Sequence, residues 1–415
     1  MSSESSLVFS NVSLCVPKLS SGMSTYSSIL ISSEVSHTKG ENNVLIRVER
    51  FGFSTNNITY QALGEIPHFR YFDFHQVPET QQESSKSLGL IPVWGFGTVL
   101  WSSNKKIQVG ERVHSFYVAR PHLPRDRRPY NQIIRCESDP QYNPSADLED
   151  LTMLYRPLFW TSFWCEDWLS VSGFREGTSN FLISSASSKT AFCLAYLLRR
   201  RFSREGKTDL NLVGLTSSKN VEFTQSLELY DTISGYGELK ALIPAIERRR
   251  WIYVDVAGNE ELNQEIRLLF STLKSTSLSA QISLGLTNIK PDSTQTSLSS
   301  WAKNTHLVDA ATQRSNLGST HIPKSENFFM PEWLAVRRTQ LSIPQITKMQ
   351  NDAWSDLLKE GRTWVQLERI SGPFNVQKKY DEVVKNGLGP DKGYIWSLWD
   401  ESLLNSNKPT VITKL

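Results

Sequence analysis

The chain contains little cysteine, and its cysteines form no pattern. Among 415 residues there are four, Cys15, Cys136, Cys165 and Cys193, and no two of them stand in a C-x-x-C or C-x-x-x-x-C spacing. Disulfide frameworks and structural zinc sites both use closely spaced cysteines. This scarcity therefore argues against both and is typical of a reducing compartment.

A charge excess of one sign is also missing. The 45 basic and 42 acidic residues leave a formal net charge of +3 at pH 7, so neither nucleic acid nor a membrane surface is implied as a partner. No apolar run is long enough to span a bilayer, and no signal peptide is evident at the N-terminus. We expect a cytoplasmic protein. As an alternative, Thr413-Lys414-Leu415 differs at one position from the S-K-L peroxisomal signal.

What the chain does contain is a change of pattern along its length. Residues 1–40 are rich in serine and are expected to be loosely structured, apart from one candidate strand at 27–35. Apolar and polar residues then alternate from residue 44, and further short strands are expected within 91–103 and 111–119. The first third is therefore predicted to be β-rich, as a partly open barrel or a sandwich.

Beyond about residue 147 the pattern predicts strands and helices in alternation. Strands are expected at 180–184, 210–215, 251–256 and 280–285, and helices at 189–202, 219–227 and 259–273. Such an alternation is typical of a parallel sheet covered on both faces, so the fold class is α/β. Further helices are expected at 344–358 and 373–386.

The turn that follows the strand at 180–184 reads S-A-S-S-K-T-A and leads into a helix. The unpaired backbone N–H groups at the start of a helix favour the binding of an anion. A Walker loop is excluded, because Ile183 and Ser188 stand where it needs glycines. A dinucleotide loop, G-x-x-G-x-x-G, would place Ser185, Ser188 and Ala191 at its glycine positions. Alanine is tolerated at the third. The two serines are departures, although their hydroxyls can donate to phosphate.

The end of the second strand predicts which dinucleotide the turn would hold. It reads Thr216-Ser217-Ser218-Lys219-Asn220, which offers hydroxyls and one ammonium but no carboxylate. A carboxylate there would bind the ribose 2′-OH of NAD, whereas these groups suit the 2′-phosphate of NADP. NADP(H) is therefore favoured over NAD(H). The alternative is that this segment only caps the helix that follows it.

These segments together resemble the medium-chain dehydrogenase/reductases, in the zinc-free quinone- and enoyl-reductase branch. The resemblance rests on FLISSASSKTAFCLAYLLRR, NLVGLTSSKNVEFTQSLELYDTISGY and WIYVDVAGNEEL in the cofactor domain, and on VLIRVERFGFSTNN and IPVWGFGTVLWSSNKKIQVGERVHSF in the first domain. It runs from about residue 40 to 400 with the order preserved. YRPLFWTSFWCEDWL and PVWGFG also resemble an uncharacterised branch of this superfamily, which is catalogued only as a domain of unknown function.

The resemblance implies a Rossmann sheet plus a β-rich GroES-like catalytic domain. It implies a first part of the catalytic domain at 1–169, a Rossmann dinucleotide-binding domain at 170–322 and a return to the catalytic domain at 323–415. NADPH is the implied cofactor and a small molecule the implied substrate. A homodimer through SAQISLGLTN is expected by analogy with the family.

The resemblance also implies roles for single residues. Cofactor contacts are implied for Ser185, Ser187, Ser188, Lys189, Thr190, Thr216, Ser217, Ser218, Lys219, Val256, Ala257 and Gly258. Asp255 is expected to be a hydrogen-bond acceptor at a strand end rather than a catalytic group. No catalytic metal is expected, because the seven histidines are scattered singly.

The implied catalytic residues are Tyr60 and Arg156. Tyr60 falls where enoyl reductases carry a tyrosine that protonates the product, although Asn57 replaces the family's aspartate nearby. Its alternative role is that of a buried aromatic ring whose hydroxyl satisfies a backbone group. Arg156, with Tyr155, would orient a polar substrate.

Other positions carry weaker expectations. Arg156 could instead pair with Glu149 or Asp150, and Tyr130 and Asn131 are further candidates for the substrate site by position. The aromatic residues of HFRYFDFH at 68–75, with Trp94, Phe96, Phe159 and Trp160, would either line a site for a planar substrate or form core.

The implied function is NADPH-dependent, zinc-independent transfer of hydride to a quinone or to the activated double bond of an α,β-unsaturated carbonyl compound. The rival is a reductase-like binding or scaffold protein that has lost turnover, since two loop glycines are replaced. The loop conformation bears on this choice. A glycine-like φ above zero at Ser185 and Ser188 favours the rival, and an open helix start at Lys189 favours the enzyme.

Overall fold

The computed structural model describes residues 8–36, 42–66, 69–78, 86–116, 132–246, 248–273, 277–286, 290–292 and 323–400. It divides into two compact units. The β-rich unit comprises Met1–Leu154, Lys290–Ser293 and Asn351–Leu415, and the parallel-sheet unit comprises Tyr155–Ile289 and Thr294–Gln350. Each unit is described by itself.

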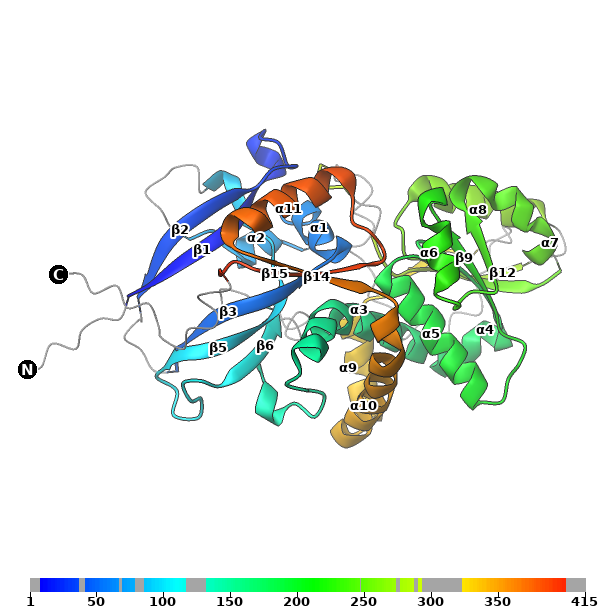
Figure 1. The fold of residues 1–415 in the computed structure, drawn as a ribbon. Coiled ribbons are helices and arrows are strands. Elements are labelled where there is room, and N and C mark those ends of the chain that lie inside the picture. Colours follow the sequence, from blue (N-terminus) through cyan, green and yellow to red (C-terminus); the bar gives the residue numbers. More distant parts are fainter. Residues whose placement is uncertain are drawn as a thin grey trace, which may run out of the picture. The chain divides into compact units, whose positions relative to one another are not determined.

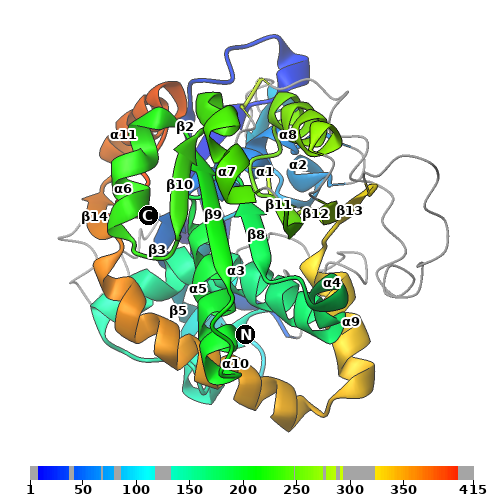
Figure 2. The ribbon, with the colours of Figure 1, turned by 90° about the vertical axis from the view of Figure 1, so that its right-hand side faces the viewer.

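Within its described residues, the parallel-sheet unit is built on six strands. They are β8 (Asn180–Ile183), β9 (Asn211–Thr216), β10 (Thr232–Gly235), β11 (Arg250–Asp255), β12 (Ser277–Ser283) and β13 (Ser325–Asn327). Their order across the sheet is β10-β9-β8-β11-β12-β13, and every neighbouring pair is parallel. Figure 2 shows β10, β9 and β8 side by side. This is the strand order of the Rossmann fold, 3-2-1-4-5-6, so the predicted fold of this unit is confirmed.

Helices cover both faces of this sheet. The helices described in this unit are α4 (Gly173–Gly177), α5 (Lys189–Arg204), η5 (Ser218–Asn220), α6 (Val221–Ser226), η6 (Tyr236–Leu242), α7 (Ile243–Ile246), α8 (Glu260–Thr272) and α9 (Met330–Gln340). The two helices α3 (Ala146–Val171) and α10 (Ile343–Glu360) run through the boundaries between the units. On one face α7 and α8 share a core with Leu182, Val213 and Trp251. On the other, Phe181 contacts Phe202 of α5, with ring centroids 6.4 Å apart.

The part of the β-rich unit that the structure describes forms two sheets. Its strands are β1 (Val8–Pro17), β2 (Ile29–Ser36), β3 (Val44–Phe53), β4 (Leu88–Leu90), β5 (Trp94–Ser102), β6 (Arg112–Phe116), β7 (Ile134–Arg135), β14 (Gln366–Ser371) and β15 (Lys392–Ser397). One sheet has the order β2-β1-β4 and the other β14-β15-β3-β5-β6-β7. Figure 1 shows β3, β5 and β6 side by side. The β-rich first third is therefore confirmed.

The helices of this unit are short except for the last. They are η1 (Leu19–Ser21), α1 (Thr55–Ala62), α2 (Tyr71–Phe74), η4 (Cys136–Ser138), η10 (Gly361–Thr363) and α11 (Pro373–Asn386). α11 contributes Val376 and Tyr380 to a core with Phe53 of β3 and Trp396 of β15, whose rings stack at 4.1 Å. The helix expected at 373–386 is found with the same bounds.

The loose structure expected for residues 1–40 is wrong for residues 8–17. β1 pairs antiparallel with β2 from Val8↔Ser36 to Cys15↔Ile29. Serines do not break this pairing because their hydroxyls find partners: Asn11 Nδ2 donates to Ser33 Oγ at 2.9 Å and to Ser13 Oγ at 3.2 Å. Cross-strand hydrogen bonds of this kind are a normal source of sheet stability.

Two boundaries in the parallel-sheet unit also differ from the prediction. The last strand expected at 280–285 lies at 277–283, and β13 pairs with it from Gln281↔Ser325 to Ser283↔Asn327. The helix expected at 219–227 begins as the single 3-10 turn η5 before α6. Because β13 is distant in the sequence, the alternation of strands and helices gave no sign of it.

Candidate functional site

The carboxyl ends of β8, β9, β10 and β11 lie next to one another, and we call this the carboxyl edge of the sheet. The order β10-β9-β8-β11 places the chain after Ile183 between the chain after Thr216 and the chain after Asp255. Strand order reverses between β8 and β11. Open α/β sheets bind ligands at such a reversal, outside the carboxyl ends of the strands.

Ser184 ties the ends of β8 and β11 together at this reversal. Its hydroxyl donates to Asp255 Oδ1 at 3.0 Å and accepts from the backbone N–H groups of Val256 at 2.9 Å and Ala257 at 3.1 Å. The other carboxylate oxygen of Asp255 accepts from Asn263 Nδ2 of α8 at 2.8 Å. Asp255 is therefore the strand-end acceptor that the sequence predicted.

The network around Asp255 is buried and shifts its pKa. Burial raises the pKa of this carboxyl, and the hydrogen bonds from Asn263, the Gly258 N–H and Ser184 work in the opposite direction. Tyr253 extends the network, since its hydroxyl donates to Asn263 Oδ1 at 2.7 Å. The side chains of Ser184, Tyr253, Asp255 and Asn263 thus form one buried, fully hydrogen-bonded network. This network supports the turn at 184–191, which we call the loop.

The loop crosses closely over β9. The Ala186 N–H donates to the Leu215 carbonyl at 2.9 Å, and the Tyr230 hydroxyl donates to the Ala186 carbonyl at 3.0 Å. A methyl group on Gly214 would lie 2.9 Å from the Ala186 Cβ. Glycine at 214 and a small residue at 186 are therefore what allow the approach.

The Ser187 hydroxyl is engaged within the edge. It accepts from Thr216 Oγ1 at 3.1 Å and from Asn220 Nδ2 at 3.1 Å, and both Ser187 and Thr216 are buried. These two cofactor candidates therefore fasten the loop to the end of β9. The structure gives each of them a partner inside the protein.

The two serines at glycine positions behave differently. Ser185 has a φ of +52°, the left-handed region that favours glycine, and its N–H donates to the Tyr236 hydroxyl at 3.1 Å. Ser188 has an ordinary φ of −78° and accepts from the Ala191 N–H at 3.3 Å, as the N-cap of α5. Ser185 thus meets the criterion for the rival function, and Ser188 does not. Thr190 is buried, and Ser185, Ser188 and Lys189 are half-buried.

Hydroxyls and a lysine follow β9 at the solvent surface. Ser217 is half-buried, while Ser218 and Lys219 are exposed, and Lys219 makes no ion pair with any residue described. The capping alternative for this segment is wrong, because neither Ser217 nor Asn220 makes a side-chain cap hydrogen bond to η5 or α6. Asn220 reaches Ser187 instead.

The turn after β11 is closely packed. Val256 and Ala257 are buried, whereas Gly258 is exposed with a φ of +65°. A methyl group on Gly258 would lie 2.6 Å from Leu286 Cδ2, so the position requires glycine for space as well as for conformation. Of the three residues, Gly258 is the most open to solvent.

Tyr60 lies in α1 of the β-rich unit. Its side chain is buried, its ring lies 4.8 Å from the Tyr71 ring between centroids, and its hydroxyl accepts from Asn56 Nδ2 at 2.6 Å. Asn57 stabilises the start of this helix through a capping box with Ser54. The helix α1 therefore holds the phenol of Tyr60 in one position.

Tyr155 and Arg156 lie in α3, with different surroundings. Tyr155 is fully buried against Phe192 of α5, and burial raises its pKa well above 10, so its proposed contact with substrate is wrong. Arg156 is half-buried. Phe96 and Phe159 are also fully buried, and Trp94 and Trp160 are half-buried. Tyr130 and Asn131 lie outside the described residues.

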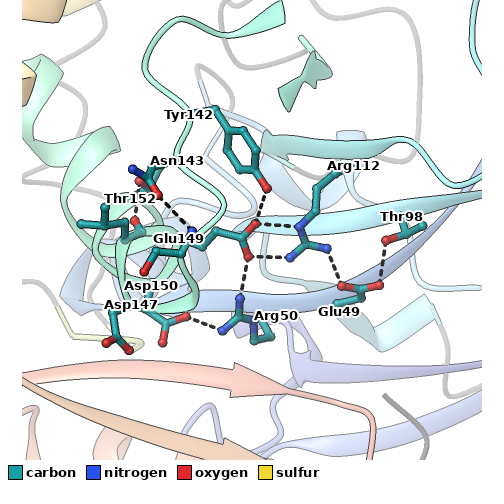
Figure 3. Close-up of polar contacts among 12 residues, drawn as sticks. Glu49, Arg50, Thr98, Arg112, Tyr142, Asn143, Asp147, Glu149, Asp150 and Thr152 are labelled. Atoms are coloured by element: carbon teal, nitrogen blue, oxygen red, sulfur yellow. Dashed lines mark hydrogen bonds and ion pairs between the residues drawn. The ribbon is translucent and has the colours of Figure 1, made fainter. Parts of the chain in front are cut away.

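A second concentration of polar side chains lies in the β-rich unit, and Figure 3 shows it. We call it the Glu149 cluster; its members are Glu49, Arg50, Arg112, Tyr142, Glu149 and Asp150. Arg112 donates to Glu149 through Nε and Nη2, each at 2.6 Å, and Arg50 donates to Glu149 at 2.6 Å and to Asp150 at 2.8 Å. Arg112 also pairs with Glu49.

The cluster joins β3 and β6 to the first turns of α3. The side chains of Glu149 and Asp150 are 3% and 0% exposed. The more exposed Arg369 of β14 also pairs with Asp150. The predicted pairing of Arg156 with Glu149 or Asp150 is therefore replaced by Arg50, Arg112 and Arg369. Burial, then hydrogen bonding to Glu149, raises the pKa of Tyr142 to about 12.

The described residues offer no metal site, no disulfide and no membrane-spanning helix. No group of three or more His, Cys, Asp or Glu side chains is placed to hold a metal ion. The four cysteines are free and buried, and burial raises the pKa of Cys15 to about 12. No helix in the described ranges is long and apolar enough to cross a membrane.

Sequence reasoning missed Ser184 and Tyr236 as parts of the site. Both directly follow strands of the parallel sheet, Ser184 after β8 and Tyr236 after β10. Their place at the strand ends was the available signal, since the carboxyl ends of parallel strands share one edge. It also missed Glu238, which the return of the chain through β10 brings to the same edge.

Comparison with known proteins supports the fold. Residues 51–389 match the family described as "Protein of unknown function (DUF2855)". Among solved structures, CurA from Vibrio vulnificus in complex with NADPH has a TM-score of 0.55 at 10% identity, over 94% of this chain and 100% of that one. The yhdH oxidoreductase from Salmonella enterica in complex with NADP has a TM-score of 0.49 at 12% identity, over 93% and 99%. No curated protein matches by sequence. The CurA likeness extends over both units and agrees with a Rossmann sheet plus a β-rich GroES-like domain.

Proposed function

The chain belongs to the DUF2855 family, and we propose that it is an NADPH-dependent, zinc-independent reductase-like protein. The acceptor would be a quinone or the activated double bond of an α,β-unsaturated carbonyl compound. The observation that carries the proposal is the set of groups at the carboxyl edge, where Ser217, Ser218 and Lys219 lie beside the start of a 16-residue helix at the strand-order reversal. The NADP and NADPH complexes of the similar folds support it.

The donor set at this edge fits a dinucleotide that carries a 2′-phosphate. Ser218 and Lys219 are exposed, and neither side chain is engaged with another described residue, so both can meet an anion without breaking a contact. The pyrophosphate would lie over Ser185, Ser188, Lys189 and Thr190, at the positive end of the α5 dipole. Val256, Ala257 and Gly258 would border the nicotinamide.

The chemistry divides between cofactor and protein. NADPH, when bound, supplies the hydride, and the protein supplies orientation and a proton. We assign the proton to Tyr60, because the amide of Asn56 donates to its phenol oxygen at 2.6 Å and would stabilise the phenolate left behind. Arg156 would orient a polar group of the acceptor.

A second function is favoured by one observation, the conformation of Ser185. A side chain at φ +52° adds bulk where the dinucleotide loop has glycine, and the Ser185 N–H is already hydrogen-bonded to Tyr236. The alternative is therefore a reductase-like binding or scaffold protein without turnover.

A cytoplasmic location and a homodimer belong to the proposal in either case. β13 already pairs with Gln281–Ser283 of β12. A dimer that extends the sheet at this edge would therefore pair through β13 of each chain.

The test is titration of the full chain with NADPH and with NADH, by calorimetry or nicotinamide fluorescence. We expect Lys219→Ala to weaken NADPH binding by about 1.5–3 kcal/mol, as for a lost charged hydrogen bond, and to leave NADH binding unchanged. Lys324→Ala is the matched control, since this exposed lysine precedes β13 at the amino edge of the sheet. Equal losses for both cofactors would remove the assigned role of Lys219. Binding of neither cofactor to the unmutated chain would favour the alternative.

A further inference from the structure

A carboxylate lies beside the hydroxyl and lysine group at the end of β9. Gly235 is the last residue of β10, which is hydrogen-bonded to β9, and Gly235 is the register partner of Thr216. A methyl group on Gly235 would lie 3.4 Å from Ser218 Oγ and 3.6 Å from Glu238 Oε2. The Ser218 hydroxyl and the Glu238 carboxylate therefore both lie close to the position that a side chain of residue 235 would occupy. Because residue 235 is a glycine, it places no side chain of its own at that position.

Glu238 is available to a ligand. It lies in η6, it is exposed, and its carboxylate makes no hydrogen bond or ion pair with a described residue. Lys219 is equally unengaged, so the two opposite charges do not neutralise each other by direct contact. A ligand bound against Ser218 would meet a positive group and a negative group at the same time.

We propose that Glu238 is a specificity-determining residue that lowers the preference for NADPH over NADH. The inference rests on the proposed function. A carboxylate accepts from the 2′-OH of NADH, as the acidic residue of NAD-binding sites does, and it repels the 2′-phosphate of NADPH. Lys219 acts in the opposite direction on the phosphate. Selectivity at this edge is thus the difference between two opposing charges on neighbouring strand ends.

The expected size of the effect follows from Coulomb's law. Two like charges about 7 Å apart at a protein surface repel enough to change an affinity about 3- to 30-fold, depending on how far water screens them. Because Glu238 and Lys219 are both exposed to solvent, their effects on the affinity for the phosphate must shrink as salt is added. A contribution from altered folding would not depend on which of the two cofactors is titrated.

The experiment is titration of the full-length Glu238→Gln variant with NADPH and with NADH, at low and at high salt. We expect NADPH to bind about 3- to 30-fold more tightly at low salt, with less gain at high salt. NADH should bind equally or slightly more weakly, because the amide remains an acceptor. Glu265→Gln is the control, because it removes the same charge from an exposed site in the middle of α8.

The outcomes separate this inference from the proposed function. A higher NADPH-to-NADH affinity ratio in Glu238→Gln, and not in Glu265→Gln, supports the role of Glu238. An unchanged ratio in a protein that binds NADPH would overturn that role and leave the proposed function standing. If the unmutated chain binds neither cofactor, the proposed function fails and the inference fails with it. If both variants change the ratio equally, the effect is one of net charge and Glu238 has no specific role.

Discussion

The carboxyl edge of the parallel sheet and the Glu149 cluster of the β-rich unit both consist of polar groups, but they use them differently. In the cluster, each carboxylate is paired with at least one guanidinium, and Glu149 and Asp150 are buried. At the edge, the buried members are hydroxyl and amide groups with one carboxylate, Asp255, and the charged Lys219 and Glu238 are exposed and unengaged.

The difference separates a structural use of charge from one suited to binding. Buried charges that have all their partners within the protein leave nothing for a ligand, and exposed charges without partners can serve one. Strongly paired groups in the Glu149 cluster therefore join β3 and β6 to α3. Substitution of the exposed residues Lys219 and Glu238 at the carboxyl edge should therefore change binding more than stability.

The largest expected effect is on the cluster, from Arg112→Leu. This change leaves the buried Glu149 with fewer partners and removes one partner of Glu49. We expect the free energy of unfolding to fall by about 3–5 kcal/mol, as when one member of a buried ion pair is removed. Urea denaturation measures it. The control is Arg267→Leu, whose pair with Glu260 is largely exposed and should contribute about 0–1 kcal/mol. Equal losses in the two variants would show that the cluster is not a special source of stability.

A smaller effect is expected beneath the loop, from Ser184→Ala. The change leaves the N–H groups of Val256 and Ala257 without their acceptor, and an unpaired buried donor costs about 1–3 kcal/mol. Thermal or urea unfolding would measure the loss of stability. NADPH titration of the same variant would show whether the hydrogen-bond network around Asp255 positions the loop. Ser203→Ala, at an exposed site in α5, is the control and should change neither quantity. Unchanged stability in Ser184→Ala would contradict the role of the network.

The smallest effect is a difference in pH dependence. Burial works to raise the pKa of Glu49, but hydrogen bonds from Arg47, Arg112 and Thr98 and the charge of Arg112 outweigh it and lower that pKa. A carboxyl whose pKa is lowered on folding stabilises the protein above its unfolded pKa, and this contribution is lost as the pH falls. Stability should therefore decline below about pH 4 more steeply in the unmutated chain than in Glu49→Gln. Parallel curves of unfolding free energy against pH would count against this assignment.

The same two regions show how far the sequence carries. The strands and helices around the carboxyl edge could be predicted, because buried parallel strands are short apolar runs and α5 and α8 have an apolar face. The Glu149 cluster could not, since Arg50, Arg112 and Glu149 are far apart in the chain and nothing local pairs them. The strand at 8–17 was missed because serines conceal its alternation, and β13 because its partner β12 is about forty residues away.

Within the candidate site, the residue types were visible in the sequence and their tasks were not. The sequence determined which groups follow each strand, and hence that Ser185, Ser218, Lys219 and Gly258 reach one edge, because the ends of parallel strands lie together. Only the tertiary structure decided that Ser187 holds Thr216, that Tyr236 holds the loop at Ser185, and that Glu238 flanks Ser218. Partners across strands depend on sheet order and on the path of the chain between strands, and local sequence encodes neither.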